Sequence, residues 1–315
     1  MNGNLLHSVW TEKYRPTKIE DCILPDAAAN EFQGFIKQGK IPNLLLCGPA
    51  GTGKTTTAIA LCNELGYDYM IINGSNEGRL IDTLRTKITN FASSMSLEAT
   101  RKCVILDEAD YVPQEIQAAM RSFMEEFSSN CAFIMTCNFP NRIMDALHSR
   151  CAVVDFTIPK DERQPMIIKL YKRVTAILTA EGVEFDKHAV ATMINKFFPD
   201  MRRLLNEMQR KGVSGEINAG SLGGTVESDL AELVKHLKDK NFREVRKWCA
   251  TTPNLDISYI SRELYSSMYD ICVHEDMPNL ILLLAQYQYR NAFVADKEIN
   301  IMAMFVEIMT EVRFK

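Results

Sequence analysis

The sequence predicts an α/β fold built on a parallel sheet, with all-helical segments after it. Short apolar runs alternate with amphipathic helical patterns over residues 44–156. A glycine-rich phosphate-binding pattern follows the first of these runs. After Pro159 the strand-like runs stop, while helical patterns continue. Because alternating strands and helices pack as a sheet covered on both faces, the first half of the chain is predicted to be a doubly wound module.

Five apolar runs are predicted to be the strands of this sheet. They cover residues 44–47, 69–72, 102–106, 133–136 and 153–156. Helices are predicted at 26–37, 79–91 and 114–127, where apolar residues recur at helical spacing. The spacing therefore predicts an α/β domain over residues 1–158.

Helical patterns continue at 166–178, 189–197 and 201–208, and a further set begins near residue 230. Between them, residues 211–225 carry five glycines and few large apolar side chains, which is typical of a linker. We therefore expect a small helical domain with its linker over 159–224, and a second helical domain over 225–315.

Composition excludes several classes of protein. A hydrophobic fraction of 46% and a charged fraction of 24% are typical of an ordered globular chain. No apolar run reaches membrane-spanning length, and the first residues lack a secretory pattern. The nine cysteines form no C-x-x-C pair, which predicts a reduced, cytoplasmic compartment without a zinc module. A net charge of −4 argues against nonspecific coating of DNA, although one face can still be basic.

The segment CGPAGTGKTTT, residues 47–57, carries the clearest motif. Gly48, Gly53, Lys54 and Thr55 complete the phosphate-loop pattern between a predicted strand and a predicted helix. The glycines allow backbone N–H groups to converge on phosphate oxygens at a helix N-terminus. Lys54 is expected to reach the terminal phosphates, and the Thr55 hydroxyl to bind Mg²⁺. The expected nucleotide-binding residues of the loop are Gly51, Thr52, Gly53, Lys54, Thr55 and Thr56.

Polar residues follow two other predicted strands at the same edge of the sheet. Asp107 and Glu108 end the run CVIL, and Asn138 follows the run FIMTC. Open α/β sheets bind ligands at this edge. Asp107 is expected to hold Mg²⁺, Glu108 to polarise the attacking water, and Asn138 to contact the γ-phosphate or that water. The alternatives are a solvated acidic turn and an ordinary turn asparagine.

Together with their flanks, these motifs resemble the clamp-loader branch of the AAA+ ATPases. WTEKYRP at 10–16 is similar to the N-terminal box of replication factor C small subunits, and QAAMR at 117–121 to their Q-A-A-L-R-R segment. Ser149-Arg150-Cys151 matches the arginine-finger tripeptide, and FPDMRR at 198–203 resembles the sensor-2 box. The segment 76–80 departs from the family pattern. ITNFASS, RSFMEEFSSNC and FPDMR are most similar to the T-even-phage branch, and the likeness weakens after residue 209.

The resemblance implies an AAA+ module followed by a helical lid and a helical collar that oligomerises. It implies an ATP hydrolase that uses Mg²⁺ and assembles with further copies of itself and a second clamp-loader subunit. Such an assembly opens a ring-shaped sliding clamp and places it on primer–template DNA.

The resemblance also implies roles for residues outside the phosphate loop. Arg150 would act on the nucleotide of a neighbouring subunit, because a loop after the fourth strand cannot easily reach its own. Arg202, or Arg203 beside it, would report the nucleotide state to the lid. The adenine would be lined by Thr11, Glu12, Lys13, Tyr14 and Ile23. The alternatives are a surface arginine and ordinary packing aromatics.

In clamp loaders the two helices predicted at 79–91 and 114–127 face the DNA. Phosphate contacts from Arg79, Arg85, Lys87 and Arg121 would position the duplex without reading its sequence. The alternative is a set of solvated charges opposite the core face. Phe91, Met95 and Leu97 are candidates for contacting the clamp, although apolar residues at a helix end are more often core.

Two other functions compete with clamp loading. A DNA-remodelling motor such as a branch-migration helicase would need a DNA-inserting hairpin, and the sequence shows no such insertion between the predicted strands. A nucleotide-gated scaffold would bind ATP without hydrolysing it, but Glu108 and Arg150 argue against that function.

Overall fold

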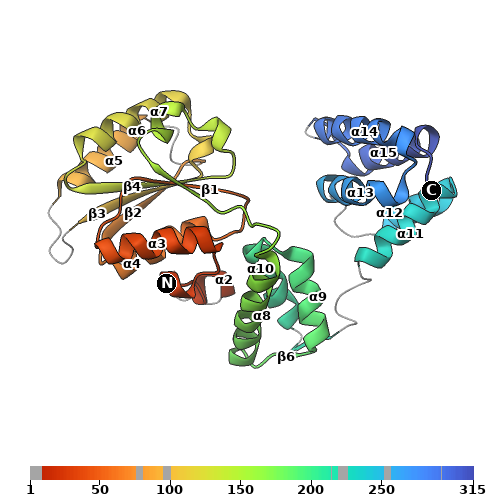
Figure 1. Ribbon diagram of the computed structural model, residues 1–315, viewed down its shortest axis with the longest axis horizontal. Coiled ribbons are helices and arrows are strands. Elements are labelled where there is room, and N and C mark those ends of the chain that lie inside the picture. Colours follow the sequence, from red (N-terminus) through yellow and green to blue (C-terminus); the bar gives the residue numbers. More distant parts are fainter. Residues whose placement is uncertain are drawn as a thin grey trace. The chain divides into compact units, whose positions relative to one another are not determined.

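The computed structural model describes residues 9–75, 81–94, 101–213, 215–218, 226–251, 257–291 and 293–315. The chain divides into two compact units, Met1–Leu222 and Gly223–Lys315. The first unit holds a sheet between two layers of helices and a separate group of helices, and the second is helical (Figure 1).

The sheet consists of five parallel strands in the order β2-β3-β4-β1-β5. The predicted parallel sheet is therefore confirmed, and each predicted strand matches an observed one with small shifts at the ends. The strands are β1 (Leu44–Cys47), β2 (Asp68–Asn73), β3 (Lys102–Asp107), β4 (Cys131–Cys137) and β5 (Ala152–Asp155). The register places Cys47 of β1 opposite Cys137 of β4, so both strands end at the same edge.

The central strands are buried on both faces, which explains their nearly continuous apolar sequences. Leu44 and Leu46 belong to one core, with α3 (Asp26–Gln38), α4 (Lys54–Glu64) and η1 (Ile19–Asp21). Leu45 and Cys47 belong to the other core, on the opposite face. The helices on that second face are α5 (Ile81–Ser93), α6 (Gln114–Glu126) and α7 (Asp145–His148), with the short turns η2 (Ala109–Tyr111) and η3 (Pro140–Arg142).

A third core joins the helices after the sheet to the N-terminal box. The helices are α8 (Arg163–Ala180), α9 (Lys187–Phe197) and α10 (Met201–Gly212). Trp10, in α2 (Trp10–Lys13), is buried in this core, and its backbone N–H donates to Gln209 Oε1 at 3.0 Å. A two-stranded parallel sheet, β6 (Glu184–Phe185) and β7 (Glu216–Ile217), lies beside these helices. Two-residue strands have no alternation that sequence reasoning could detect.

The second unit has one apolar core of its own. Its helices are α11 (Val226–Lys238), α12 (Phe242–Thr251), α13 (Ile257–Ile271), α14 (Met277–Arg290) and α15 (Lys297–Glu311), with the turn η5 (His274–Asp276). Arg313 bonds Asp276 at 2.8 Å and so fastens the C-terminal segment to η5. No helix among the described residues is long and apolar enough to span a membrane. The division of the first unit at residue 158 stays a prediction.

Candidate active site

The phosphate loop connects β1 to α4 at the carboxyl edge of the sheet. Gly53 is the N-cap of α4 with φ 92°, a left-handed conformation that glycine adopts without strain. The first N–H groups of α4 have no partner within the helix and carry its positive dipole end. The loop therefore presents these N–H groups at a helix N-terminus, an arrangement that favours anion binding.

Lys54 is buried at the start of α4, with 7% of its surface exposed. Its Nζ donates to the carbonyl oxygens of Gly48 and Pro49, both at 2.8 Å, and to Asn138 Oδ1 at 2.9 Å. Burial lowers the pKa of Lys54 below the ordinary lysine value, against the opposing effect of acidic neighbours such as Asp107. The ammonium group thus lies between the loop and the end of β4, the two elements expected to contact the terminal phosphate.

Asp107 at the end of β3 is surrounded by hydroxyl groups. Its Oδ1 accepts from Thr55 Oγ1 at 2.6 Å and from Thr136 Oγ1 at 2.7 Å. Carboxylate and hydroxyl oxygens are the hard ligands that Mg²⁺ prefers, so Asp107 and Thr55 fit a magnesium site. Sequence reasoning missed Thr136, although its place two residues before Asn138 at the end of β4 is a usable signal.

Glu108 follows Asp107 but leaves the strand. Its backbone is left-handed, with φ 57°, and its N–H donates to Thr136 Oγ1 at 3.1 Å. A non-glycine residue in this region costs free energy and persists only where its surroundings fix it. The turn separates the two adjacent carboxylates, because Asp107 belongs to β3 while Glu108 caps η2.

Asp110 fixes the backbone at Asn138. It is 6% exposed, and its Oδ2 accepts from the N–H groups of Asn138 and Phe139, both at 3.2 Å. Asp110 therefore holds the end of β4 against the turn that follows β3. Sequence reasoning assigned Asp110 no role.

One cleft of the first unit brings most of the predicted nucleotide residues together. Those that line it are Thr11, Glu12, Tyr14, Ile23, Gly51, Thr52, Gly53, Lys54, Thr55, Thr56, Asp107, Glu108, Asn138 and Arg202. Lys13 does not line the cleft. Its Nζ instead pairs with Glu181 at 2.7 Å, and this carboxylate also accepts from Tyr14 Oη at 2.5 Å.

Helix α10 begins directly on the phosphate loop. The Met201 N–H donates to the Gly51 carbonyl oxygen at 3.0 Å, and Asp200 caps the helix by accepting from the Arg203 N–H at 2.9 Å. Arg202 lines the cleft, whereas the Arg203 guanidinium lies 5.4 Å from the centre of the Phe197 ring. Of the two candidate sensor arginines, the geometry favours Arg202.

Helix α8 adds cleft residues that sequence reasoning missed. Arg173 lines the cleft and donates to the carbonyl oxygens of Tyr14 at 2.8 Å and Asp21 at 2.7 Å. Leu170 and Val174, on the same helix, also line the cleft. Both fit the apolar stripe that indicates a core, so only the tertiary structure identifies them.

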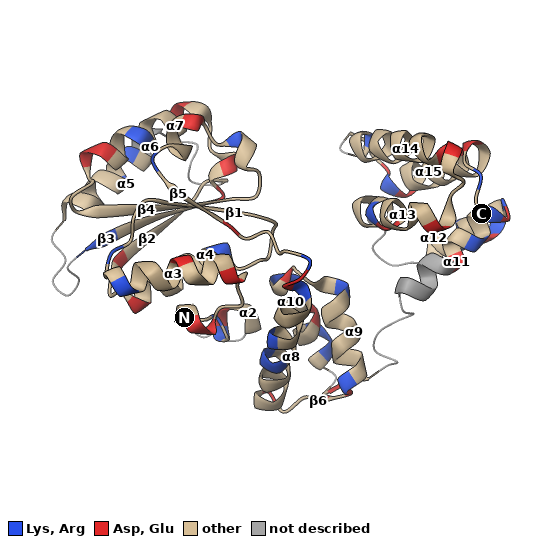
Figure 2. Cartoon of the chain, viewed as in Figure 1, with Lys and Arg blue, Asp and Glu red and all other residues tan. Residues whose placement is uncertain are grey.

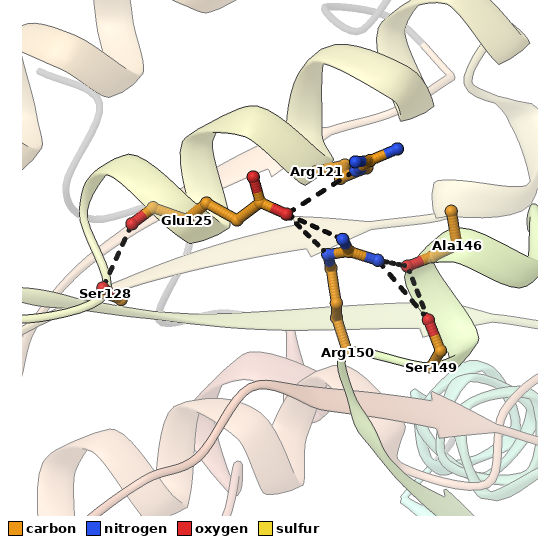
Figure 3. Close-up of polar contacts among 6 residues, drawn as sticks. All are labelled: Arg121, Glu125, Ser128, Ala146, Ser149 and Arg150. Atoms are coloured by element: carbon orange, nitrogen blue, oxygen red, sulfur yellow. Dashed lines mark hydrogen bonds and ion pairs between the residues drawn. The ribbon is translucent and has the colours of Figure 1, made fainter.

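Arg150 lies between α7 and β5 and does not line the cleft of its own chain. Its Nε and Nη2 donate to Glu125 Oε1 at 3.0 and 2.7 Å, and its Nη1 donates to the Ala146 carbonyl oxygen at 2.9 Å (Figure 3). The position agrees with the expectation that Arg150 does not serve its own nucleotide.

The DNA candidates divide between described and undescribed residues. Arg85 and Lys87 on α5, and Arg121 on α6, are exposed on two neighbouring helices that cover the same face of the sheet (Figure 1). Arg79 lies outside the described residues. Figure 2 shows basic and acidic residues interspersed along α6, and basic residues along α8 and α10.

The clamp candidates divide in the same way. Phe91 packs against the sheet core, and the Lys102 Nζ lies 4.9 Å from the centre of its ring. This position favours the core interpretation of Phe91. Met95 and Leu97 lie outside the described residues.

Comparison with known proteins finds a matching family model and several relatives. Residues 44–157 match the model of the ATPase family associated with various cellular activities (AAA). The chain is 33% identical to the sliding-clamp-loader large subunit of Escherichia phage RB69, over 99% of both chains. It is 33% identical to that of Enterobacteria phage T4, over 96% of both. It is 32% identical to the replication factor C small subunit of Methanothermobacter thermautotrophicus, over 77% of this chain and 76% of the relative.

A solved structure shows the same fold. A mutant of RuvB from Thermotoga maritima aligns with a TM-score of 0.54 over 81% of this chain and 87% of its own. The two sequences are 13% identical, so this likeness concerns the fold alone.

Proposed function

The chain belongs to the clamp-loader family of AAA ATPases, and from this premise we propose that it is the ATPase subunit of a sliding-clamp loader. Binding and hydrolysis of ATP would open a ring-shaped clamp and place it on primer–template DNA. The observation that carries this proposal is the composition of the candidate active site. The phosphate loop, Asp107, Glu108 and Asn138 all line one cleft. The likeness to clamp-loader subunits along nearly the whole chain supports it.

The protein is a nucleotide-binding ATP hydrolase, and the cleft suggests how its residues share the work. Phosphate oxygens would replace the carbonyl oxygens that Lys54 now contacts, and Asn138 would keep the ammonium group aligned with the terminal phosphate. Thr55 and Asp107 would hold Mg²⁺, which when bound neutralises part of the phosphate charge. Glu108 would accept a proton from the attacking water.

Two arginines would link this chemistry to the assembly. Arg150 would stabilise charge on the nucleotide of the neighbouring subunit, so hydrolysis would depend on assembly. Arg202, at the start of α10, would contact the γ-phosphate. Because α10 begins on the phosphate loop, a change at the γ-phosphate would reach the lid helices directly.

The partners follow from the family. The two phage relatives are named large subunits, which supports an assembly that also contains a smaller subunit. Further copies of this chain would supply the arginine fingers. Arg85, Lys87 and Arg121, with Arg79, would contact DNA phosphates, which suits a factor that acts at any primer end.

The test is the ATPase rate of the purified assembly, measured with and without primer–template DNA and a candidate clamp. We expect both additions to raise the rate, and Lys54→Ala to abolish it. A rate that neither DNA nor clamp changes would contradict the proposed function. A nucleotide-gated scaffold would show ATP binding without turnover.

A further inference from the structure

Glu125, on α6, lies between two arginines that have separate proposed roles (Figure 3). Its Oε1 accepts from Nε and Nη2 of Arg150 at 3.0 and 2.7 Å. The same oxygen lies 3.6 Å from Nε of Arg121, one helical turn earlier. A single carboxylate oxygen is therefore shared by the finger candidate and by a DNA-contact candidate.

The contacts around Arg150 fix the plane of its guanidinium group. Glu125 contacts the Nε and Nη2 side, and the Ala146 carbonyl oxygen accepts from Nη1 at 2.9 Å. Nη1 also donates to Ser149 Oγ at 3.5 Å, so both of its N–H groups have partners, whereas the second N–H of Nη2 can still donate to a phosphate. An arginine held in one plane loses less conformational freedom when it meets its target.

We infer that Glu125 is a positioning residue for Arg150, and that its hold on Arg150 depends on whether Arg121 is paired with a DNA phosphate. This inference rests on the proposed function, which supplies the roles of the two arginines. No described residue other than these two arginines forms an ion pair with Glu125.

The direction of the effect follows from the shared charge. Without DNA, Arg150 forms the shorter contacts with the Glu125 carboxylate, but the Arg121 charge at 3.6 Å also attracts it and so weakens its hold on Arg150. When a phosphate pairs with Arg121, the carboxylate charge is left to Arg150, and the finger is held more firmly in its plane. A better-aligned finger stabilises the transition state more, so DNA raises the rate of hydrolysis. Arg150 also keeps the pKa of Glu125 below the ordinary glutamate value, mainly through the hydrogen bonds that it donates.

The first experiment compares Glu125→Gln with a matched control in the full assembly. Glu126 follows on the same helix, is exposed, and forms no ion pair with any described residue, so Glu126→Gln makes the same charge change beside the site. We expect Glu125→Gln to lower kcat by about tenfold, because the amide oxygen can still accept from Arg150 but lacks the charge that strengthens these bonds. The KM for ATP should stay nearly unchanged, and stimulation by primer–template DNA should be lost. Glu126→Gln should behave as the wild type.

The second experiment removes the competing cation. Arg121→Gln should raise the ATPase rate measured without DNA, because Glu125 is then left to Arg150. The same substitution should have no such effect in a Glu125→Gln background. A purely structural role for Glu125 predicts neither result.

The outcomes separate this inference from the proposed function. If DNA stimulates the wild type but Glu125→Gln matches Glu126→Gln, the inference is wrong and the proposed function stands. If Arg121→Gln leaves the DNA-free rate unchanged or lowers it, the link between the two arginines is wrong. If DNA does not stimulate even the wild type, both the inference and the proposed function are wrong.

Discussion

Asp107 and Glu108 are adjacent in sequence, yet their surroundings suit different tasks. Asp107 ends a strand and accepts bonds from two hydroxyl groups, which suits a metal ligand. Glu108 lies on a left-handed turn after that strand and lines the cleft. In the proposal, a single peptide unit thus separates the carboxylate that would hold a metal from the one that would accept a proton.

Glu108→Gln should lower kcat by about two to four orders of magnitude, the usual contribution of a general base. Binding of ATP and of the clamp should be retained, because the amide keeps the size and polarity of the side chain. Loaded complexes should therefore accumulate. The measurement is single-turnover hydrolysis beside equilibrium ATP binding, with Glu115→Gln as an exposed control on α6. Near-normal turnover would remove Glu108 from this role.

Lys54 gives the site a pH dependence whose sign can be stated. Burial lowers the pKa of Lys54 in the free protein, whereas bound phosphates favour its charged form and raise that pKa. Between these two pKa values, ATP binding takes up a proton, so ATP affinity falls as pH rises. Calorimetry in two buffers of different ionisation enthalpy measures this uptake directly.

The control is Lys54→Arg, because arginine does not lose its proton in this range. The Lys54→Arg variant should bind ATP more weakly than the wild type at neutral pH. Its affinity should not change with pH between the two pKa values of Lys54. A pH dependence shared by both proteins would assign the effect to another group.

At the scale of elements, the start of α10 rests on the phosphate loop. Gly51 has φ 74°, and a Cβ there would overlap the Asp200 carboxylate and lie 2.9 Å from Asp200 Cα. Gly51→Ala should therefore strain the loop and push α10 away from it. We expect weaker ATP binding together with a lower melting temperature.

Gly39 provides the matched comparison for this prediction. It has φ 64°, but an added Cβ would meet nothing within 4 Å. Gly39→Ala should lose about 1 kcal/mol of unfolding free energy from the left-handed backbone alone and bind ATP normally. If Gly51→Ala binds ATP as well as Gly39→Ala does, the contact between α10 and the loop has no role in nucleotide binding.

The same elements show what a sequence can and cannot predict. The sheet strands were predictable because they are buried on both faces and read as apolar runs. The meeting of the motif residues in one cleft was predictable, because phosphate and metal chemistry requires particular residue types at fixed spacing. Arg173 was not, because it lies on an amphipathic helix and meets the cleft only through tertiary packing. Lys13 was expected at the adenine, but its Nζ pairs with Glu181 and the residue does not line the cleft.

At the scale of the whole molecule, the two units have separate cores and, in the proposal, separate tasks. The first unit contains every described residue proposed for nucleotide chemistry or DNA contact. The second is a helical unit that we propose to be the oligomerisation collar. Neither unit alone accounts for the proposed role of Arg150. This residue lies away from the cleft of its own chain and would need a neighbouring subunit to act.

Mixing two inactive variants tests this dependence on a neighbour most directly. Arg150→Ala lacks the finger, and Lys54→Ala lacks a working nucleotide site, so assemblies of either variant alone should be inactive. In mixed assemblies, a Lys54→Ala subunit can offer Arg150 to the intact site of an Arg150→Ala subunit. We predict that ATPase activity, measured with primer–template DNA, returns on mixing. Mixed assemblies verified by native mass spectrometry that remain inactive would contradict the account.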